Sequence, residues 1–165
     1  MTTGQKQTKR VQQIYAAIIA SFALNFMPNI LVQIIASLVF LGVFIGLYVL
    51  RKLSEEDGLI DNHTTYLIRS IWIGGGFVIL GLLVAIVYFI GTIGMEEYAR
   101  LGQQAMERGN MQEFAEVYQS RYPDEVFMAV VLTMGPGTVY VAYRFAKGLA
   151  RASKGYRMAK PLSWF

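Results

Sequence analysis

The residues Ile30–Leu50, ILVQIIASLVFLGVFIGLYVL, contain no charged side chain and end at a basic pair. About 20 apolar residues in a helix cross the hydrocarbon core of a bilayer, which is about 30 Å thick. A second uncharged stretch, Ile71–Gly94, meets the same criterion and has Arg69 just before it. These two stretches predict an all-α membrane protein.

The composition supports this environment. Of the 165 residues, 55% are hydrophobic and 16% charged, against roughly 45–50% and 25% in soluble domains. A small soluble domain keeps much of its surface in water and cannot bury so much apolar surface. The chain has no Cys, which excludes disulfides, thiolate metal sites and a cysteine nucleophile.

A stretch before the first of these spans, Val11–Met27, is uncharged but short and contains two Gln and one Asn. Pro28 and Asn29 follow it as a turn signal. We interpret Val11–Met27 as a first membrane helix. Two alternatives stay open, a shallow re-entrant arm and the apolar core of a signal peptide.

A fourth stretch, Val126–Phe145, is interrupted by Gly135-Pro136-Gly137. Proline removes a backbone donor and clashes with the preceding helical turn, so a helix break or kink is predicted at these three residues. Broken helices line binding sites in transporters, although packing between helices is the simpler interpretation.

The basic residues predict the topology. Lys and Arg concentrate on the cytoplasmic side of short-loop membrane proteins. With four spans and both termini cytoplasmic, twelve of the 15 basic residues lie inside; six of them are Arg144 and the five Lys and Arg of a basic tail at 146–165. The outer segment holds three Arg and seven acids. We therefore expect a membrane protein with spans at about 11–27, 30–50, 71–94 and 126–145, and interface anchors at Arg69, Trp72 and Trp164. Arg144 is expected to reach the interface from the end of the last span.

The polar stretch 95–125 is predicted to be a helical hairpin outside the membrane, between the third and fourth spans. Met111, Phe114 and Tyr118 recur with Ala115 at helical spacing and form one apolar stripe. This stripe is a candidate partner-binding surface; the alternative is that the hairpin lies on its own membrane domain.

No catalytic, metal or cofactor site is predicted. An ionisable residue in the middle of a span is the usual sign of a transport or proton-relay site, and the predicted spans carry none there. His63, on the loop before the third span, lacks a second His or Cys for metal binding and a nucleophile for catalysis. A hydrogen-bonding role at the start of that helix is the simpler interpretation. The chain also has no nucleic-acid-binding motif, so its net charge of +4 is attributed to topology and anionic lipid.

Three phrases of the sequence stand out together: His63 followed by Ile68-Arg69-Ser70-Ile71-Trp72-Ile73, then Lys147-Gly148-Leu149, and the ending Pro161-Leu162-Ser163-Trp164-Phe165. With them the chain resembles a family of small, uncharacterised bacterial inner-membrane proteins related to the DUF4870/Tic20-like group. The resemblance implies a helical protein of the bacterial inner membrane and no established activity. Its distant link to a chloroplast import component slightly favours a transport or assembly role, by analogy.

These observations predict a non-enzymatic accessory or assembly subunit that acts by helix–helix and hairpin-mediated association. Its expected partners are the lipid bilayer and either another membrane protein or further copies of itself, without nucleic acid. The alternative is a small oligomeric transporter or channel subunit in which the break at 135–137 lines the path.

Overall fold

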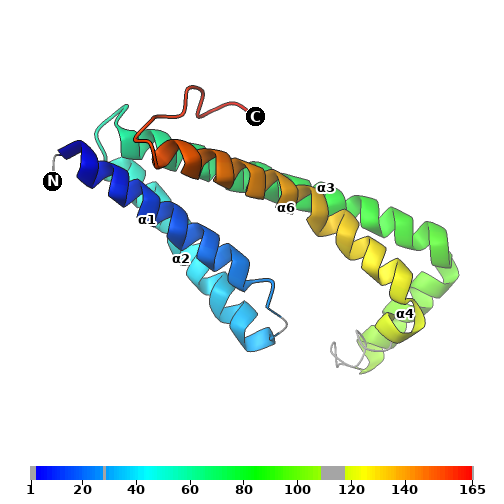
Figure 1. Cartoon of the computed structure of the whole chain (residues 1–165). Coiled ribbons are helices and arrows are strands. Elements are labelled where there is room, and N and C mark those ends of the chain that lie inside the picture. Colours follow the sequence, from blue (N-terminus) through cyan, green and yellow to red (C-terminus); the bar gives the residue numbers. More distant parts are fainter. Residues whose placement is uncertain (1–2, 28, 109–117, 165) are drawn as a thin grey trace. The chain divides into compact units, whose positions relative to one another are not determined.

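The computed structural model describes residues 3–27, 29–108 and 118–164, and every regular element within these ranges is a helix. In chain order they are α1 (Thr3–Leu24), α2 (Ile30–Leu53), α3 (Leu59–Ile93), α4 (Met95–Arg108) and α6 (Pro123–Ala152) (Figure 1). The all-helical fold class is confirmed.

Three of these helices are long and apolar enough to cross a membrane, judged by length and composition over the described residues. They comprise Leu31–Leu53 of α2, all of α3 and all of α6. They coincide with the second, third and fourth predicted spans. α1, which contains most of the predicted first span, is not one of them. Four crossings therefore remain a prediction.

The helices extend beyond the predicted spans. α3 begins at Leu59 rather than near Ile71, so the loop expected between the second and third spans is short. α6 runs from Pro123 to Ala152 and contains Pro136 inside its assigned length. The predicted break at 135–137 thus lies inside a single helix, α6. Met95–Arg108, the first part of the predicted hairpin, is helical.

Local signals fix several helix ends. The Asn29 side-chain oxygen accepts a hydrogen bond from the Val32 backbone N–H at 3.1 Å and so caps the start of α2. Gly94 separates α3 from α4 with a φ of +87°, which glycine adopts without steric cost. Gly155, at φ +70°, ends the turn that follows α6 in the same way.

The chain divides into two compact units, which we describe separately. Unit 1 comprises Met1–Ile73 and Val141–Phe165, and unit 2 comprises Gly74–Tyr140. Helices α3 and α6 each contribute residues to both.

Unit 1 is organised around the buried face of α1. Val11, Tyr15 and Ile18 are each 0% exposed, and their spacing of four and three residues places them on one side of the helix. The Tyr15 ring lies against Gly148 of α6, where any added Cβ would collide with it. Gly148 therefore sets how closely α1 approaches α6.

Aromatic and polar contacts attach α2 to its neighbours in unit 1. The Phe22 and Phe40 rings lie 6.3 Å apart between α1 and α2. At the other end of α2, the Trp72 indole N–H donates to the Tyr48 hydroxyl at 2.6 Å. The Phe44 ring packs edge-on against the Trp72 ring, with centroids 6.1 Å apart.

In unit 2, α3 and α6 approach closely at glycine. A Cβ on Gly81 would collide with the backbone oxygens of Leu132 and Thr133. Because Pro136 has no N–H, the Leu132 oxygen lacks its usual helical donor four residues later. Gly81 thus packs against the carbonyl that Pro136 leaves without a helical donor. Contacts between Cα–H groups and carbonyl oxygens recur where helices cross this closely.

Candidate functional site

The first candidate site is the face of α2 that points away from its neighbours in unit 1. Ala36 and Leu47, on the opposite side, are each 1% exposed. Only 11% of the most apolar 18-residue stretch of α2 is buried. The outward face, which we call the Gly42–Gly46 face, consists of Ile35, Leu38, Val39, Gly42, Ile45, Gly46 and Val49.

Two glycines give this face a shape suited to another helix. Gly42 and Gly46 are four residues apart, and a Cβ built on either would meet no atom of the described residues within 4 Å. In lipid, helices associate through close packing rather than the hydrophobic effect, and a Gly-x-x-x-Gly pair lets two backbones approach. Sequence analysis missed this pair, although its spacing is visible in the sequence.

The second candidate is a buried polar cluster in unit 1, where α3 meets the segment after α6. His63 is fully buried. Its Nε2 atom lies 2.9 Å from the Tyr156 backbone oxygen, and its Nδ1 lies 3.1 Å from the Tyr15 hydroxyl oxygen. A carbonyl oxygen can only accept, so Nε2 carries the proton and Nδ1 accepts from Tyr15. The predicted hydrogen-bonding role of His63 is confirmed, but its position is in α3 rather than on a loop.

Arg144 belongs to the same unit and is also fully buried, so the expectation that it reaches the interface is wrong. Its Nε donates to the Ser70 hydroxyl at 3.0 Å and one terminal nitrogen to the Ser163 backbone oxygen at 2.9 Å. Its guanidinium carbon lies 3.8 Å from the centre of the Tyr66 ring. A buried guanidinium is costly unless it is hydrogen-bonded and stacked in this way. The position of the C-terminal segment explains the burial, and sequence position alone gave no signal of it.

These contacts use the polar atoms of the cluster to hold the chain together. Both ring nitrogens of His63 are engaged by other groups of the protein, which leaves neither oriented toward a substrate. Among the described residues, no group of three or more His, Asp or Glu side chains is placed to hold a metal ion. The cluster is thus a structural junction between α1, α3 and the segment after α6.

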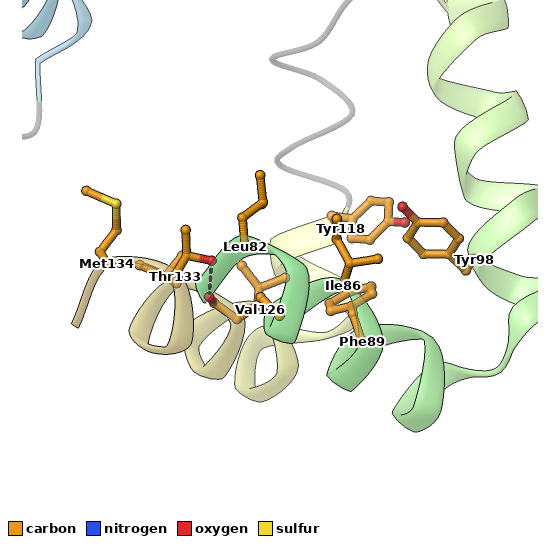
Figure 2. A pocket seen from close by; sticks show the side chains of 11 residues that line it. Leu82, Ile86, Phe89, Tyr98, Tyr118, Val126, Thr133 and Met134 are labelled. Atoms are coloured by element: carbon orange, nitrogen blue, oxygen red, sulfur yellow. Dashed lines mark hydrogen bonds between the residues drawn. The ribbon is translucent and has the colours of Figure 1, made fainter. Parts of the chain in front are cut away.

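The third candidate is an apolar cavity of about 340 Å³ in unit 2, between α3 and α6. Figure 2 shows Tyr98 and Tyr118 at one end and Met134 at the other. Thr133 lies beside Met134, and its hydroxyl donates to the Ala129 backbone oxygen of its own helix at 2.8 Å (Figure 2). The cavity therefore offers an apolar wall and few free polar groups.

Beside this cavity, the Glu97 carboxylate joins α4 to the residues before α6. Arg100 donates to both Glu97 oxygens, at 2.6 and 2.8 Å, and the Tyr122 hydroxyl donates to one of them at 2.8 Å. Arg121 lies 3.4 Å from the same oxygen. The hydrogen bonds from Arg100 and Tyr122 lower the pKa of Glu97 to about 2. The carboxylate in turn raises the pKa of the Tyr122 hydroxyl, because that hydroxyl must keep its proton to donate.

The predicted partner-binding residues and the residues of the predicted helix break have different surroundings in the structure. Met111 and Phe114, two of the three predicted partner-binding residues, lie outside the described residues. The third, Tyr118, stacks on Phe89 of its own unit, with ring centroids 5.5 Å apart, and lines the cavity. At the predicted helix break, Gly137 packs on α3, because a Cβ added to it would lie 3.0 Å from the Gly74 oxygen. A Cβ on Gly135 would meet, among the described residues, the Val131 side chain at 3.8 Å.

The predicted interface anchors are partly exposed. Trp72 and Trp164 are 64% and 58% exposed, as an anchor at the bilayer surface requires. Arg69 is half-buried. Their role as anchors remains a prediction.

No protein-family model, curated protein or solved structure matches this chain. The resemblance to the DUF4870/Tic20-like group therefore remains a prediction from the quoted phrases.

Proposed function

We propose that this chain is a non-enzymatic integral membrane protein that acts by association, as an accessory or assembly subunit of a membrane complex. The observation that carries the proposal is the Gly42–Gly46 face. Space for another helix is present at both glycines, and most of the apolar stretch of α2 is not buried by the chain itself. The occupant of this face is a membrane helix, from either another protein or a second copy.

The arrangement in the membrane is part of the same proposal. α1 provides a first crossing, both termini are cytoplasmic, and the membrane is the bacterial inner membrane. The charge pattern supports this, since the basic residues of unit 1 gather in the segments assigned to the cytoplasm. A polar hairpin between the third and fourth crossings would then face outward. Its contribution to association rests on Met111, Phe114 and Tyr118.

The test replaces both glycines by leucine, Gly42→Leu with Gly46→Leu, in the full chain. The added side chains would keep a partner helix from close approach. We expect at least a tenfold loss of the cross-linked partner or homo-oligomer in native membranes. Differently tagged copies of the chain distinguish the two occupants.

The matched control is Gly91→Leu. Gly91 also lies in a candidate span with nothing within 4 Å of its Cβ position, but it has no glycine four residues away. This variant should leave the cross-linked species unchanged. An unchanged partner set in the Gly42/Gly46 double variant would refute association through α2.

A small oligomeric transporter or channel is the second candidate. The observation that bears on it is the cavity beside Thr133 and Met134, next to the predicted break at 135–137. Its apolar lining suits an acyl chain better than a hydrated ion. If this alternative holds, Pro136→Ala should alter solute flux in reconstituted vesicles, whereas absence of any flux in the unchanged protein rules it out.

A further inference from the structure

An open cleft lies between the N-terminal half of α1 and the turn after α6, within unit 1. Its volume is about 670 Å³, and Lys9 and Lys154 line it from opposite segments of the chain. We call it the Lys9–Lys154 cleft. Its other polar lining residues are Gln5, Thr8, Gln12 and Ser153.

The fold brings these two segments together through a close backbone approach. Gly155 adopts a φ of +70°, which reverses the chain at the end of α6. The Thr8 hydroxyl oxygen would lie 3.2 Å from a Cβ at this glycine. The turn after α6 therefore rests against α1, and Lys154 is held across from Lys9. Figure 1 shows the start of α1 and the end of α6 at the same end of unit 1.

The electrostatics of the cleft favour an anion. Residues 3–12 and 146–164 together contain eight Lys and Arg and no Asp or Glu. Two acids of unit 1 have other partners, since Asp57 pairs with Arg157 at 3.2 Å and Asp61 with Arg51 at 3.6 Å. Glu55 lines a separate pocket, with Lys6 and Arg10. In the described part of the chain, neither Lys9 nor Lys154 has a carboxylate partner.

The position of the cleft indicates which anion. The apolar part of α1 begins at Val11, and the last candidate span ends at Ala152. In the topology proposed above, where α1 is a first crossing, this puts the cleft where helices leave the hydrocarbon core, at the depth of lipid phosphates; in this respect the inference rests on the proposed function. Each ammonium offers three donors and the Gln12 amide two, all suited to phosphate oxygens. Lysines at this depth attract anionic lipid.

We propose that the Lys9–Lys154 cleft binds the phosphate headgroup of an anionic phospholipid. This inference goes beyond the proposed association through α2, and it uses different residues at a different place in unit 1. It concerns a defined site, and so differs from the diffuse attraction that all basic residues near a membrane contribute.

The test measures retention of phosphatidylglycerol and phosphatidylcholine by the full chain, purified in mild detergent with defined amounts of each lipid. Native mass spectrometry reads the bound lipid. The variant carries Lys9→Gln and Lys154→Gln, which keep polar side chains of similar length. We expect its affinity for phosphatidylglycerol to fall about thirtyfold, about fivefold for each charge-assisted hydrogen bond to the phosphate that is lost. Lys154→Gln alone should lose about fivefold and serves if the double variant is unstable.

The matched control carries Lys52→Gln and Lys160→Gln, which remove the same charge from exposed lysines outside the cleft. It should retain phosphatidylglycerol within about threefold of the unchanged chain. An equal loss in both double variants would overturn the cleft as a site. Equal binding of phosphatidylcholine, or full competition by inorganic phosphate at the same concentration, would overturn the assignment to an anionic lipid.

The two proposals fail separately. Cross-linking through α2 should be unchanged in the Lys9/Lys154 variant, and lipid retention should be unchanged in the Gly42/Gly46 variant. A joint loss of both readouts in either variant would contradict their independence.

Discussion

The side-chain amide of Asn62 is hydrogen-bonded to both backbone groups of Met158. Its oxygen accepts from the Met158 N–H at 2.6 Å, and its nitrogen donates to the Met158 carbonyl oxygen at 3.1 Å. The two residues are 96 positions apart in the chain, and both are buried. Together with the contact between His63 and Tyr156, this pair fixes the segment after α6 against the start of α3.

Asn62→Ala should release this segment. The change leaves the Met158 backbone groups buried without partners, which costs about 2–4 kcal/mol of unfolding free energy. We expect a lower melting temperature in detergent and faster tryptic cleavage at Lys154 and Arg157. The control Asp57→Asn removes an exposed ion pair with Arg157 and should change stability by less than about 1 kcal/mol. Equal cleavage rates in the two variants would refute the locking role of Asn62.

Gly148→Ala should destabilise unit 1. A Cβ at this position meets the Tyr15 ring, and overpacking of a filled site costs about 1–3 kcal/mol. The measurement is thermal unfolding of the full chain in detergent. Gly75→Ala is the control, because nothing lies within 4 Å of its Cβ position, and alanine there should be neutral or stabilise by up to about 1 kcal/mol. Equal melting temperatures for the two variants would show that α1 does not pack on Gly148 as described.

Gly81→Ala should separate α3 from α6 in unit 2. The methyl group would meet backbone rather than a flexible side chain, at Leu132 and Thr133, so the helices must move. We expect a loss of about 2–3 kcal/mol, with faster hydrogen exchange of amides in the two helices. Gly76→Ala, in the same helix and with open space around its Cβ position, should exchange as the unchanged chain does. Unaltered exchange in Gly81→Ala would contradict the close crossing.

The contact between α4 and the start of α6 should depend on pH through Glu97. Its pKa is about 2 in the folded chain, below the ordinary value of 4.5, chiefly because of the hydrogen bonds from Arg100 and Tyr122. A carboxyl group whose pKa is lowered by folding stabilises the fold at pH values above its ordinary pKa. This stabilisation is lost as the pH falls from about 4.5 to about 2. The Glu97 carboxyl signal in nuclear magnetic resonance should titrate at the lower end of this window.

Glu97→Gln serves as the control for this prediction. The amide cannot ionise, so the Tyr122 ring signals should no longer change between pH 4.5 and 2 if Glu97 causes the change. A Glu97 carboxyl that titrates near its ordinary value in the unchanged chain would show that the network with Arg100 does not form.

The amino-acid sequence by itself determined the class of the protein. Uncharged stretches such as Ile30–Leu50 and Ile71–Gly94 can satisfy their backbone groups in lipid only as helices, so the all-helical fold and three helices able to span a membrane follow from composition and length. The hydrogen-bonding role of His63 followed from the absence of any ligand or nucleophile around it in the sequence.

Only the tertiary structure decided which side chains are enclosed. Arg144 stands near the end of an apolar stretch, where sequence position predicts exposure, yet the segment carrying Ser163 covers it. Gly42 and Gly81 look alike in the sequence, but Gly81 meets the backbone of α6 and Gly42 meets open space. The physical reason is that an apolar residue suits lipid and a protein core equally well, so the pattern along the chain fixes that a helix forms but not which neighbour its faces contact.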